Sequence, residues 1–185
     1  MEVRKLIDAL SVAERLKDAT RHCYTKNGRH ESVAEHSWMM TLMAFFIKDE
    51  FPEVDMDKVI KMCIIHDLGE AFTGDIPAFE KTAANEQKEE ELLYNWVKNL
   101  PENYAAEMID LYDEMAKRET VEAKIYKAID GLEAVIQHNI SDLSTWLPKE
   151  YEFNKTYADD KVAFSEYLSE LREEIRKDTL KKIGE

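Results

Sequence analysis

Apolar residues recur along this chain with the three-to-four-residue period of an α-helix almost from end to end. Alternating β-branched runs are few, and only 5 Gly and 4 Pro interrupt the pattern. The chain shows no internal repeat and no low-complexity linker. The pattern therefore predicts an all-α, single-domain helical bundle over residues 1–185, with a core at about 30–140 and a C-terminal helix packed on it.

Several residues mark where these helices begin. Ser32, followed three residues later by Glu35, has the sequence of a capping box, and Asp55 is a good N-cap for the helix that ends at His66. The periodic segments predict helices at about residues 2–18, 33–50, 84–98, 121–139 and 159–181, together with one between Asp55 and His66 and one that begins at Pro101.

Three segments carry specific structural expectations. The stripe formed by Val3, Leu6, Ile7 and Leu10 is expected to pack into the core. The apolar band of residues 121–139 is broad, which predicts a central and mostly buried helix. Residues 151–157 are expected to form an irregular aromatic loop.

Composition narrows the possible partners. The formal net charge of -14 disfavours binding to duplex DNA or RNA, because such a surface repels polyanions. No apolar run approaches the roughly 20 residues of a membrane span. The two cysteines give no disulfide framework, and Cys63 lies in an apolar helix as a core residue would. We therefore expect a cytoplasmic protein with no nucleic acid polymer and no membrane as partner.

Acidic and imidazole side chains are concentrated where one apolar helix ends. His66 and Asp67 are adjacent, Glu70 follows near the same helical face, and Asp75 lies in a turn shortly after. A buried Asp needs a partner, and imidazole with carboxylate is a common ligand mixture for transition metals. An isolated His-Asp pair is more often only hydrogen-bonded or exposed, so a metal site requires further ligands elsewhere.

Other segments offer such ligands. His36 stands in the first turn of its helix, where a histidine by itself is more often a packing or capping residue than a ligand. Asp130 lies in the middle of the predicted central helix and needs a partner, which is either Lys127 or a metal. Gly131 beside it would permit close approach of a neighbouring segment.

The stretch from residue 20 to 30 contains three cations, two histidines and no acid, although the chain has 39 acidic residues. It is compatible with a solvated loop that balances neighbouring charge. It is equally compatible with an anion pocket in which an arginine such as Arg21 binds phosphate in bidentate fashion.

The order His36…His66-Asp67…Asp130 resembles the HD-domain metal-dependent phosphohydrolase superfamily. The sequences at 31–37, 66–70 and 73–77 are similar to its 5′-deoxynucleotidase branch, as is Arg21 fifteen residues before the first histidine. The resemblance covers about residues 3–140. It implies an all-helical HD-domain bundle that hydrolyses deoxynucleoside 5′-monophosphates to deoxynucleoside and phosphate, commonly as a homodimer.

The same resemblance implies roles for individual residues. One divalent cation (Co, Mn, Fe, Zn or Mg) would be held by His36, His66, Asp67 and Asp130. Arg21 would orient the phosphate, and Glu70 and Asp75 would be the two acids of the reaction centre. The implied substrate contacts are Arg21, His22, His36, Asp67, Asp75, Ile76, Pro77 and Ala78.

The chain departs from that branch at two positions. His22 stands where the branch often has Trp, and Ala78 where it often has Thr, and both changes concern sugar or base contacts. The hypothetical mechanism is attack of metal-bound water or hydroxide on phosphorus, with Arg21 stabilising the equatorial oxygens and Glu70 or Asp75 handling protons.

Competing interpretations change the substrate or the class of protein. The same fold and metal would serve hydrolysis of a nucleoside triphosphate, a cyclic nucleotide or a non-nucleotide phosphate ester. Oxygen chemistry at a two-metal site is less favoured, because it usually needs extra histidines beside the pair. A non-catalytic helical interaction module would leave the four ligand candidates as structural residues and predicts no bound metal.

Overall fold

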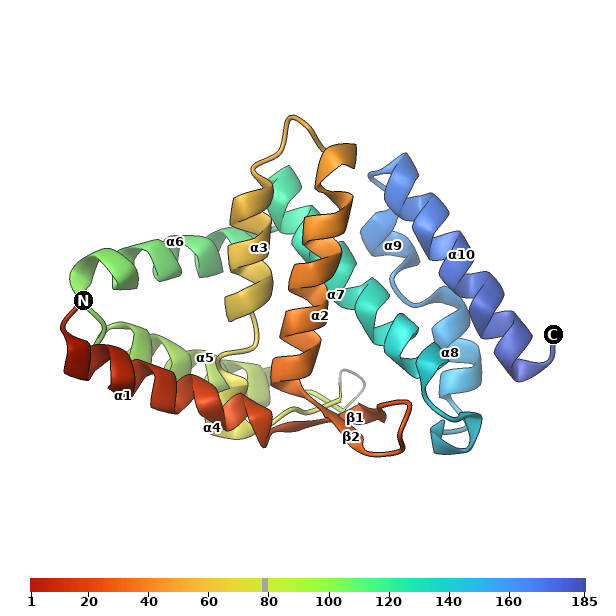
Figure 1. Ribbon diagram of the computed structural model, residues 1–185, viewed down its shortest axis with the longest axis horizontal. Coiled ribbons are helices and arrows are strands. Elements are labelled where there is room, and N and C mark those ends of the chain that lie inside the picture. The colour runs from red at the N-terminus through yellow and green to blue at the C-terminus, as the bar shows by residue number, and fades with distance from the viewer. Residues whose placement is uncertain (78–79) are drawn as a thin grey trace.

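The computed structural model describes residues 1–77 and 80–185 and shows a bundle of helices with one small two-stranded sheet (Figure 1). The all-α prediction is therefore confirmed. The elements in chain order are α1 Val3–Ala13, η1 Glu14–Lys17, β1 Thr20–Tyr24, β2 His30–Ser32, α2 Val33–Ile47, η2 Lys48–Glu50, α3 Met56–Ile65, α4 Glu70–Thr73, α5 Ala83–Val97, α6 Glu102–Lys117, α7 Val121–Ile140, η3 Leu143–Thr145, α8 Glu150–Thr156, α9 Asp159–Val162 and α10 Glu166–Ile183.

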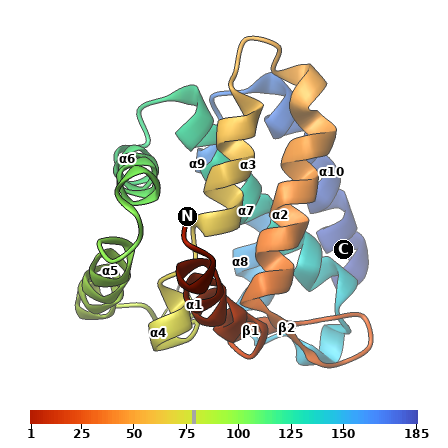
Figure 2. The same ribbon diagram turned by 60° about the vertical axis from the view of Figure 1, so that its left-hand side comes forward.

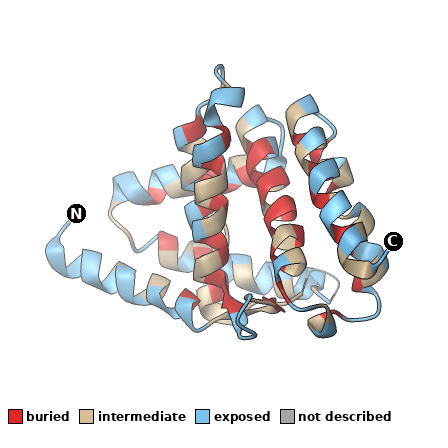
Figure 3. Cartoon of the chain, turned by 45° about the vertical axis from the view of Figure 1, so that its right-hand side comes forward, coloured by how far each residue is buried: buried red, intermediate tan, exposed pale blue. Residues whose placement is uncertain are grey.

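Helix α7 is the centre of the bundle, as its broad apolar band predicted. It lies between α2 and α3 on one side and α8, α9 and α10 on the other (Figure 1). Helices α5 and α6 lie side by side at the edge of the bundle beyond α1 and α4 (Figure 2). Figure 3 shows that most of the surface of α7 is buried, including Ile125, Ile129 and Leu132, which are fully buried. Any side chain that α7 carries near its middle is therefore held rigidly among several helices.

Local capping signals fix where α2 and α3 begin. Ser32 accepts a hydrogen bond from the Glu35 backbone while the Glu35 side chain accepts one from the Ser32 backbone, which confirms the capping box. Asp55 caps α3 through the Lys58 backbone N–H. These caps set the starting point of each helix and so place His36 in the first turn of α2.

The stretch between residues 20 and 32 forms a β-hairpin, which helical periodicity did not predict. Strands β1 and β2 pair antiparallel with an irregularity between Thr20 and Tyr24, and Gly28 takes a φ of +80° in the turn. A positive φ suits glycine because it has no Cβ to clash. The irregular strand β1 places the consecutive residues Arg21, His22 and Cys23 along one pocket.

The expectation that the N-terminal helix packs into the core is wrong. Helix α1 has no buried residue, and its apolar stripe faces solvent: Val3 is 73% exposed and Leu10 is 58% exposed. Amphipathic periodicity predicts a helix and its apolar face, but it does not tell what covers that face.

The C-terminal part also differs from expectation. Residues 150–156 form helix α8 instead of an irregular aromatic loop, and the last predicted helix is divided into α9 and α10. Ser165 caps α10 through the Leu168 backbone N–H, which explains the division. Buried Arg172 on α10 donates to the backbone carbonyls of Asn154 and Tyr157, at 3.0 and 2.8 Å, so α8 is fastened to α10.

Cys63 is fully buried, as predicted. Within the described part of the chain, no helix combines the length and the apolar character that crossing a bilayer requires.

Candidate metal centre

The four predicted ligand residues meet where three helices converge. His36 comes from α2, Asp130 from α7, and His66 with Asp67 directly follows α3. The Nε2 atom of His36 lies 3.3 Å from Asp130 Oδ1 and 4.0 Å from Asp67 Oδ2, and His66 Nε2 lies 2.9 Å from Asp67 Oδ2. The fold thus brings together two imidazoles and two carboxylates from distant parts of the sequence.

Both imidazoles are oriented by their other nitrogen. His36 Nδ1 donates to Glu133 Oε2, and His66 Nδ1 donates to the Cys63 carbonyl at 3.0 Å. The two Nε2 atoms are buried without a hydrogen-bond partner among the described residues. Because each Nδ1 carries the hydrogen, the Nε2 lone pairs point into one gap, which is how metal-binding histidines are arranged.

The charges around this gap favour a cation. Burial and Arg21 lower the pKa of His36, but Glu133 and Asp130 outweigh them and raise it to about 9. Single atoms of His36, His66 and Asp67 lie within 4.8 Å of one another, as close as ligands of one ion must be. The residues present therefore fit a divalent metal, which satisfies the same electrostatic demand without protonating the ring.

The two interpretations of Asp130 turn out to be compatible. Lys127 Nζ lies 2.6 Å from Asp130 Oδ2, so the predicted Lys127–Asp130 pair exists. The other oxygen, Oδ1, is the one that faces His36. One carboxylate can thus be held in place by the lysine and still offer an oxygen to the centre.

The two interpretations of the basic stretch, an anion pocket and a solvated loop, each apply to a part of it. Arg21 on β1 is turned inward, mostly buried, with its Nε 3.3 Å from Glu31 Oε2. Arg29 and Lys26 are exposed, and Arg29 pairs with Glu35 at the surface. Only Arg21 of the three cations therefore reaches the pocket, while residues 26–30 are exposed.

The two further acids lie beside the centre. Helix α3 ends at Ile65, and Glu70 begins a separate short helix, α4, instead of continuing the same one. Glu70 is 5% exposed, and burial, followed by repulsion from Asp67 and Asp75, raises its pKa to about 10. Burial also raises the pKa of Asp75. Burial and the neighbouring acids therefore favour the protonated form of Glu70.

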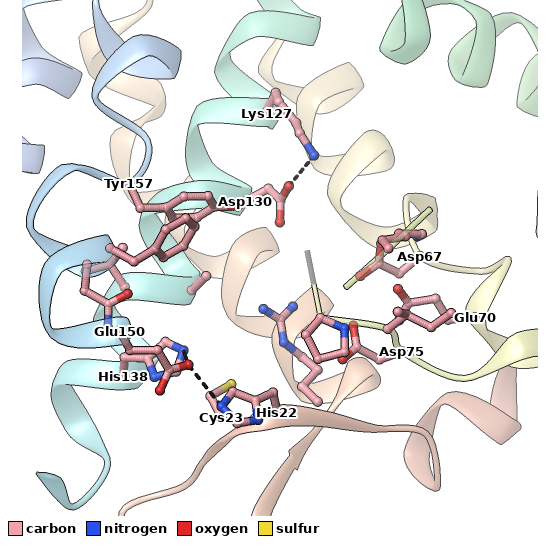
Figure 4. A pocket seen from close by; sticks show the side chains of 18 of the residues that line it. His22, Cys23, Asp67, Glu70, Asp75, Lys127, Asp130, His138, Glu150 and Tyr157 are labelled. Carbon is pink, nitrogen blue, oxygen red and sulfur yellow. Dashed lines mark hydrogen bonds and ion pairs between the residues drawn. The ribbon is translucent and has the colours of Figure 1, made fainter. Parts of the chain in front are cut away.

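These side chains line one pocket of about 290 Å³ (Figure 4). Asp67, Glu70 and Asp75 stand on one side, with Lys127 and Asp130 above them in the view. Four of the predicted substrate contacts also line it, namely Arg21, His22, Ile76 and Pro77, whereas His36 does not. The predicted contact Ala78 lies outside the described residues.

Comparison with known proteins decides the family. A family model described as the HD domain matches residues 13–172. This chain belongs to the HD-domain family. The match extends beyond the N-terminal 140 residues that the motifs alone suggested, and it includes α8 and part of α10.

Named relatives resemble this HD domain over most of its length. It is 30% identical over 138 residues to the 5′-deoxynucleotidase HDDC2 of Homo sapiens, across 72% of this chain and 67% of that protein. It is 29% identical to the 5′-deoxynucleotidase hdd1 of Schizosaccharomyces pombe, across 71% and 70%. The crystal structure of a predicted metal-dependent phosphohydrolase from Magnetospirillum magnetotacticum superposes with a TM-score of 0.80 at 25% identity, covering 96% and 94%.

Several residues of this HD-domain site escaped the sequence analysis. Glu133 follows Asp130 by three positions on α7, a spacing that places both on one face and that would have found it. Glu31 precedes the capping box and gave no separate signal. The C-terminal Glu150 and Asn154 line the far end of the pocket, and nothing in their local sequence indicates this.

Proposed function

We propose that this HD domain is a metal-dependent 5′-deoxynucleotidase, which hydrolyses deoxynucleoside 5′-monophosphates to deoxynucleoside and phosphate. The observation that carries the proposal is the pair of buried Nε2 atoms of His36 and His66, which make no hydrogen bond among the described residues and face carboxylate oxygens of Asp67 and Asp130. The names of the relatives from Homo sapiens and Schizosaccharomyces pombe support the choice of substrate.

The proposed ligands are His36, His66, Asp67 and Asp130. A bound divalent cation would neutralise phosphate oxygens and lower the pKa of a coordinated water. Arg21, held from behind by Glu31, binds the phosphate and stabilises charge on its equatorial oxygens as the P–O5′ bond breaks.

Glu70 is the proposed proton donor to the leaving 5′ oxygen. Burial and repulsion from two other acids, Asp67 and Asp75, raise the pKa of its carboxyl group, which favours the protonated form. Asp75 is the second acid of the reaction centre. The two imidazole ligands favour a transition metal such as Mn, Co, Fe or Zn over Mg.

The proposed unit is one HD domain over residues 1–185, acting in the cytoplasm, where two free and buried cysteines are in keeping with a reducing environment.

A homodimer is supported by helix α2, which exposes Trp38, Phe45 and Phe46 by 61%, 50% and 71%. Sedimentation velocity tests this: Phe46→Lys should shift a wild-type dimer toward monomer, and a monomeric wild type would contradict it.

The deciding experiment measures phosphate release from deoxy- and ribonucleoside monophosphates, triphosphates and cyclic nucleotides, with each metal added to stripped protein. We expect deoxynucleoside monophosphates to be the best substrates. Asp67→Ala should abolish both metal uptake and turnover while the helical circular dichroism spectrum is kept. Asp49→Ala, a change of an exposed acid in η2, is the matched control.

Each contrary result would have a separate meaning. Full activity of Asp67→Ala would refute the metal centre. Preference for triphosphates or cyclic nucleotides would support a metal-dependent hydrolase with a different substrate. Purified protein that takes up no metal would favour the helical interaction module instead.

A further inference from the structure

The pocket has a second end that the proposed hydrolysis does not use. Beyond Arg21 it is lined by side chains from β1, α7 and α8, namely His22, His138, Glu150, Phe153, Asn154 and Tyr157. Figure 4 shows Glu150, His138 and Tyr157 on the side opposite Asp67, Glu70 and Asp75. A substrate whose phosphate lies at Arg21 therefore has its remaining part directed along this wall.

A buried carboxylate organises the wall. Glu150 is 1% exposed, and its Oε1 lies 3.0 Å from His22 Nε2 and 3.7 Å from His138 Nε2. Its Oε2 accepts the backbone N–H of Leu147 at 2.6 Å. Burying a carboxylate is unfavourable unless it is paired, so this arrangement holds both imidazoles in fixed positions beside the pocket.

Asn154 is the polar group of the wall that lacks a partner. Its side chain lines the pocket, the residue is only 2% exposed, and its amide nitrogen has no hydrogen-bond partner among the described residues. A buried polar group left unpaired is destabilising, so such groups commonly bind a ligand or an ordered water.

The position of Asn154 is fixed by the rest of the fold. Arg172 on α10 donates to the Asn154 carbonyl and to the Tyr157 carbonyl, and its own guanidinium lies 3.1 Å from Asp159. The α8 backbone is therefore anchored, and Asn154 is held beside the pocket without needing to be ordered by a ligand. Preorganised polar groups of this kind confer specificity.

We propose that the α8 wall is the nucleoside-binding half of the pocket and that Asn154 recognises the base. The inference rests on the proposed function and deepens it. A carboxamide offers a donor and an acceptor side by side, and nucleobase edges present the complementary groups. A cavity of about 290 Å³ is at the small end for ligand sites, which suits a mononucleotide better than a larger ligand.

The test compares deoxynucleoside monophosphates of all four bases with 2-deoxyribose 5-phosphate, which has the same sugar and phosphate but no base. We expect wild-type kcat/KM to be at least about tenfold higher for the preferred nucleotide. Asn154→Leu should reduce that ratio about tenfold, chiefly through KM, which corresponds to one lost hydrogen bond to a buried group. Asn154→Asp, nearly isosteric but without a donor, should change the order of preference among the bases.

Thr179→Val is the matched control. Thr179 is a fully buried polar residue on α10 that bonds Asn139 and does not line the pocket. It should lower stability while leaving the ratio between nucleotide and base-free substrate unchanged, which separates loss of stability from loss of recognition. Circular dichroism and melting temperature are measured for every variant.

Three results would overturn the inference. One is a wild-type enzyme that hydrolyses 2-deoxyribose 5-phosphate as efficiently as every nucleotide, because the base then contributes nothing to recognition. That result would leave the proposed phosphatase activity standing. Another is equal loss on both substrates in Asn154→Leu, which makes Asn154 structural. The third is an unchanged order of bases in Asn154→Asp. Absence of all phosphate release from metal-loaded wild type would instead refute the proposed function itself.

Discussion

At the scale of single residues, the centre depends on side chains that stand behind the ligands. Glu133 is fully buried and bonds His36 Nδ1, and Glu31 is 3% exposed and pairs with Arg21. Each carboxylate fixes the orientation of one group that faces the pocket. Partners of this kind matter because they set the tautomer and the basicity of a ligand histidine.

Glu133→Gln should therefore weaken metal binding, although the side chain at position 133 is not itself a proposed ligand. The substitution keeps a hydrogen-bond acceptor and removes the charge, so we expect metal affinity to fall about 10-fold, and toward 100-fold for Glu133→Ala. Titration of stripped protein with Mn²⁺ or Co²⁺ measures the affinity directly. Glu119→Gln, at an exposed position just before α7, is the control. Unchanged affinity in Glu133→Gln would show that Glu133 only fills space.

At the scale of elements, the pocket requires close approach of the C-terminal segment to α7. Gly131 makes this approach possible, because a Cβ on residue 131 would lie 2.7 Å from the Ala158 Cβ and 3.2 Å from Lys161 Nζ. Ala158 takes a φ of +71°, an unusual conformation for a residue with a side chain. The two residues together bring the end of α8 beside Asp130.

Gly131→Ala should destabilise the protein in spite of its better helix propensity. The propensity gain is about 1 kcal/mol, whereas overpacking of a tight contact typically costs about 1–3 kcal/mol. Urea denaturation should show a net loss of stability. The double variant Gly131→Ala/Ala158→Gly should recover it, because glycine removes the clashing Cβ and tolerates the positive φ. A stabilised single variant would contradict the close approach.

At the scale of the whole molecule, a strongly acidic protein places three cationic side chains among the acids of one pocket. The net charge is -14, yet Arg21, Lys81 and Lys127 all line the cavity. The overall field disfavours polyanions, while this local group can hold a small phosphate. The same acidic interior makes the folded state depend on a cation, because two carboxylates and two imidazoles are brought close together by folding.

Metal binding should consequently stabilise the fold. A metal at 100 times its dissociation constant adds about 2.7 kcal/mol if only the folded state binds it. We expect Mn²⁺ or Co²⁺ to raise the melting temperature of stripped protein and a chelator to lower it again. Asp67→Ala should eliminate the shift, and Asp49→Ala should keep it. An equal shift in all three proteins would mean that the ion acts elsewhere on the acidic surface.

Much of this protein is determined locally, and the sequence therefore predicted it. The 3.6-residue period predicted the helices, the capping side chains at Ser32 and Asp55 predicted where two of them begin, and the order of His36, His66, Asp67 and Asp130 predicted which residues meet. Each of these signals depends on a few neighbouring residues, or on a motif whose members are themselves the functional groups.

Only the tertiary structure decided which faces are covered and what lies across the pocket. The apolar stripe of α1 remains exposed, residues 20–32 pair as a hairpin, and α8 forms where an irregular loop was expected. These outcomes depend on contacts between segments far apart in the chain, such as that of Arg172 with Asn154. Local propensity cannot determine them, because burial and pairing depend on which partner the fold brings alongside.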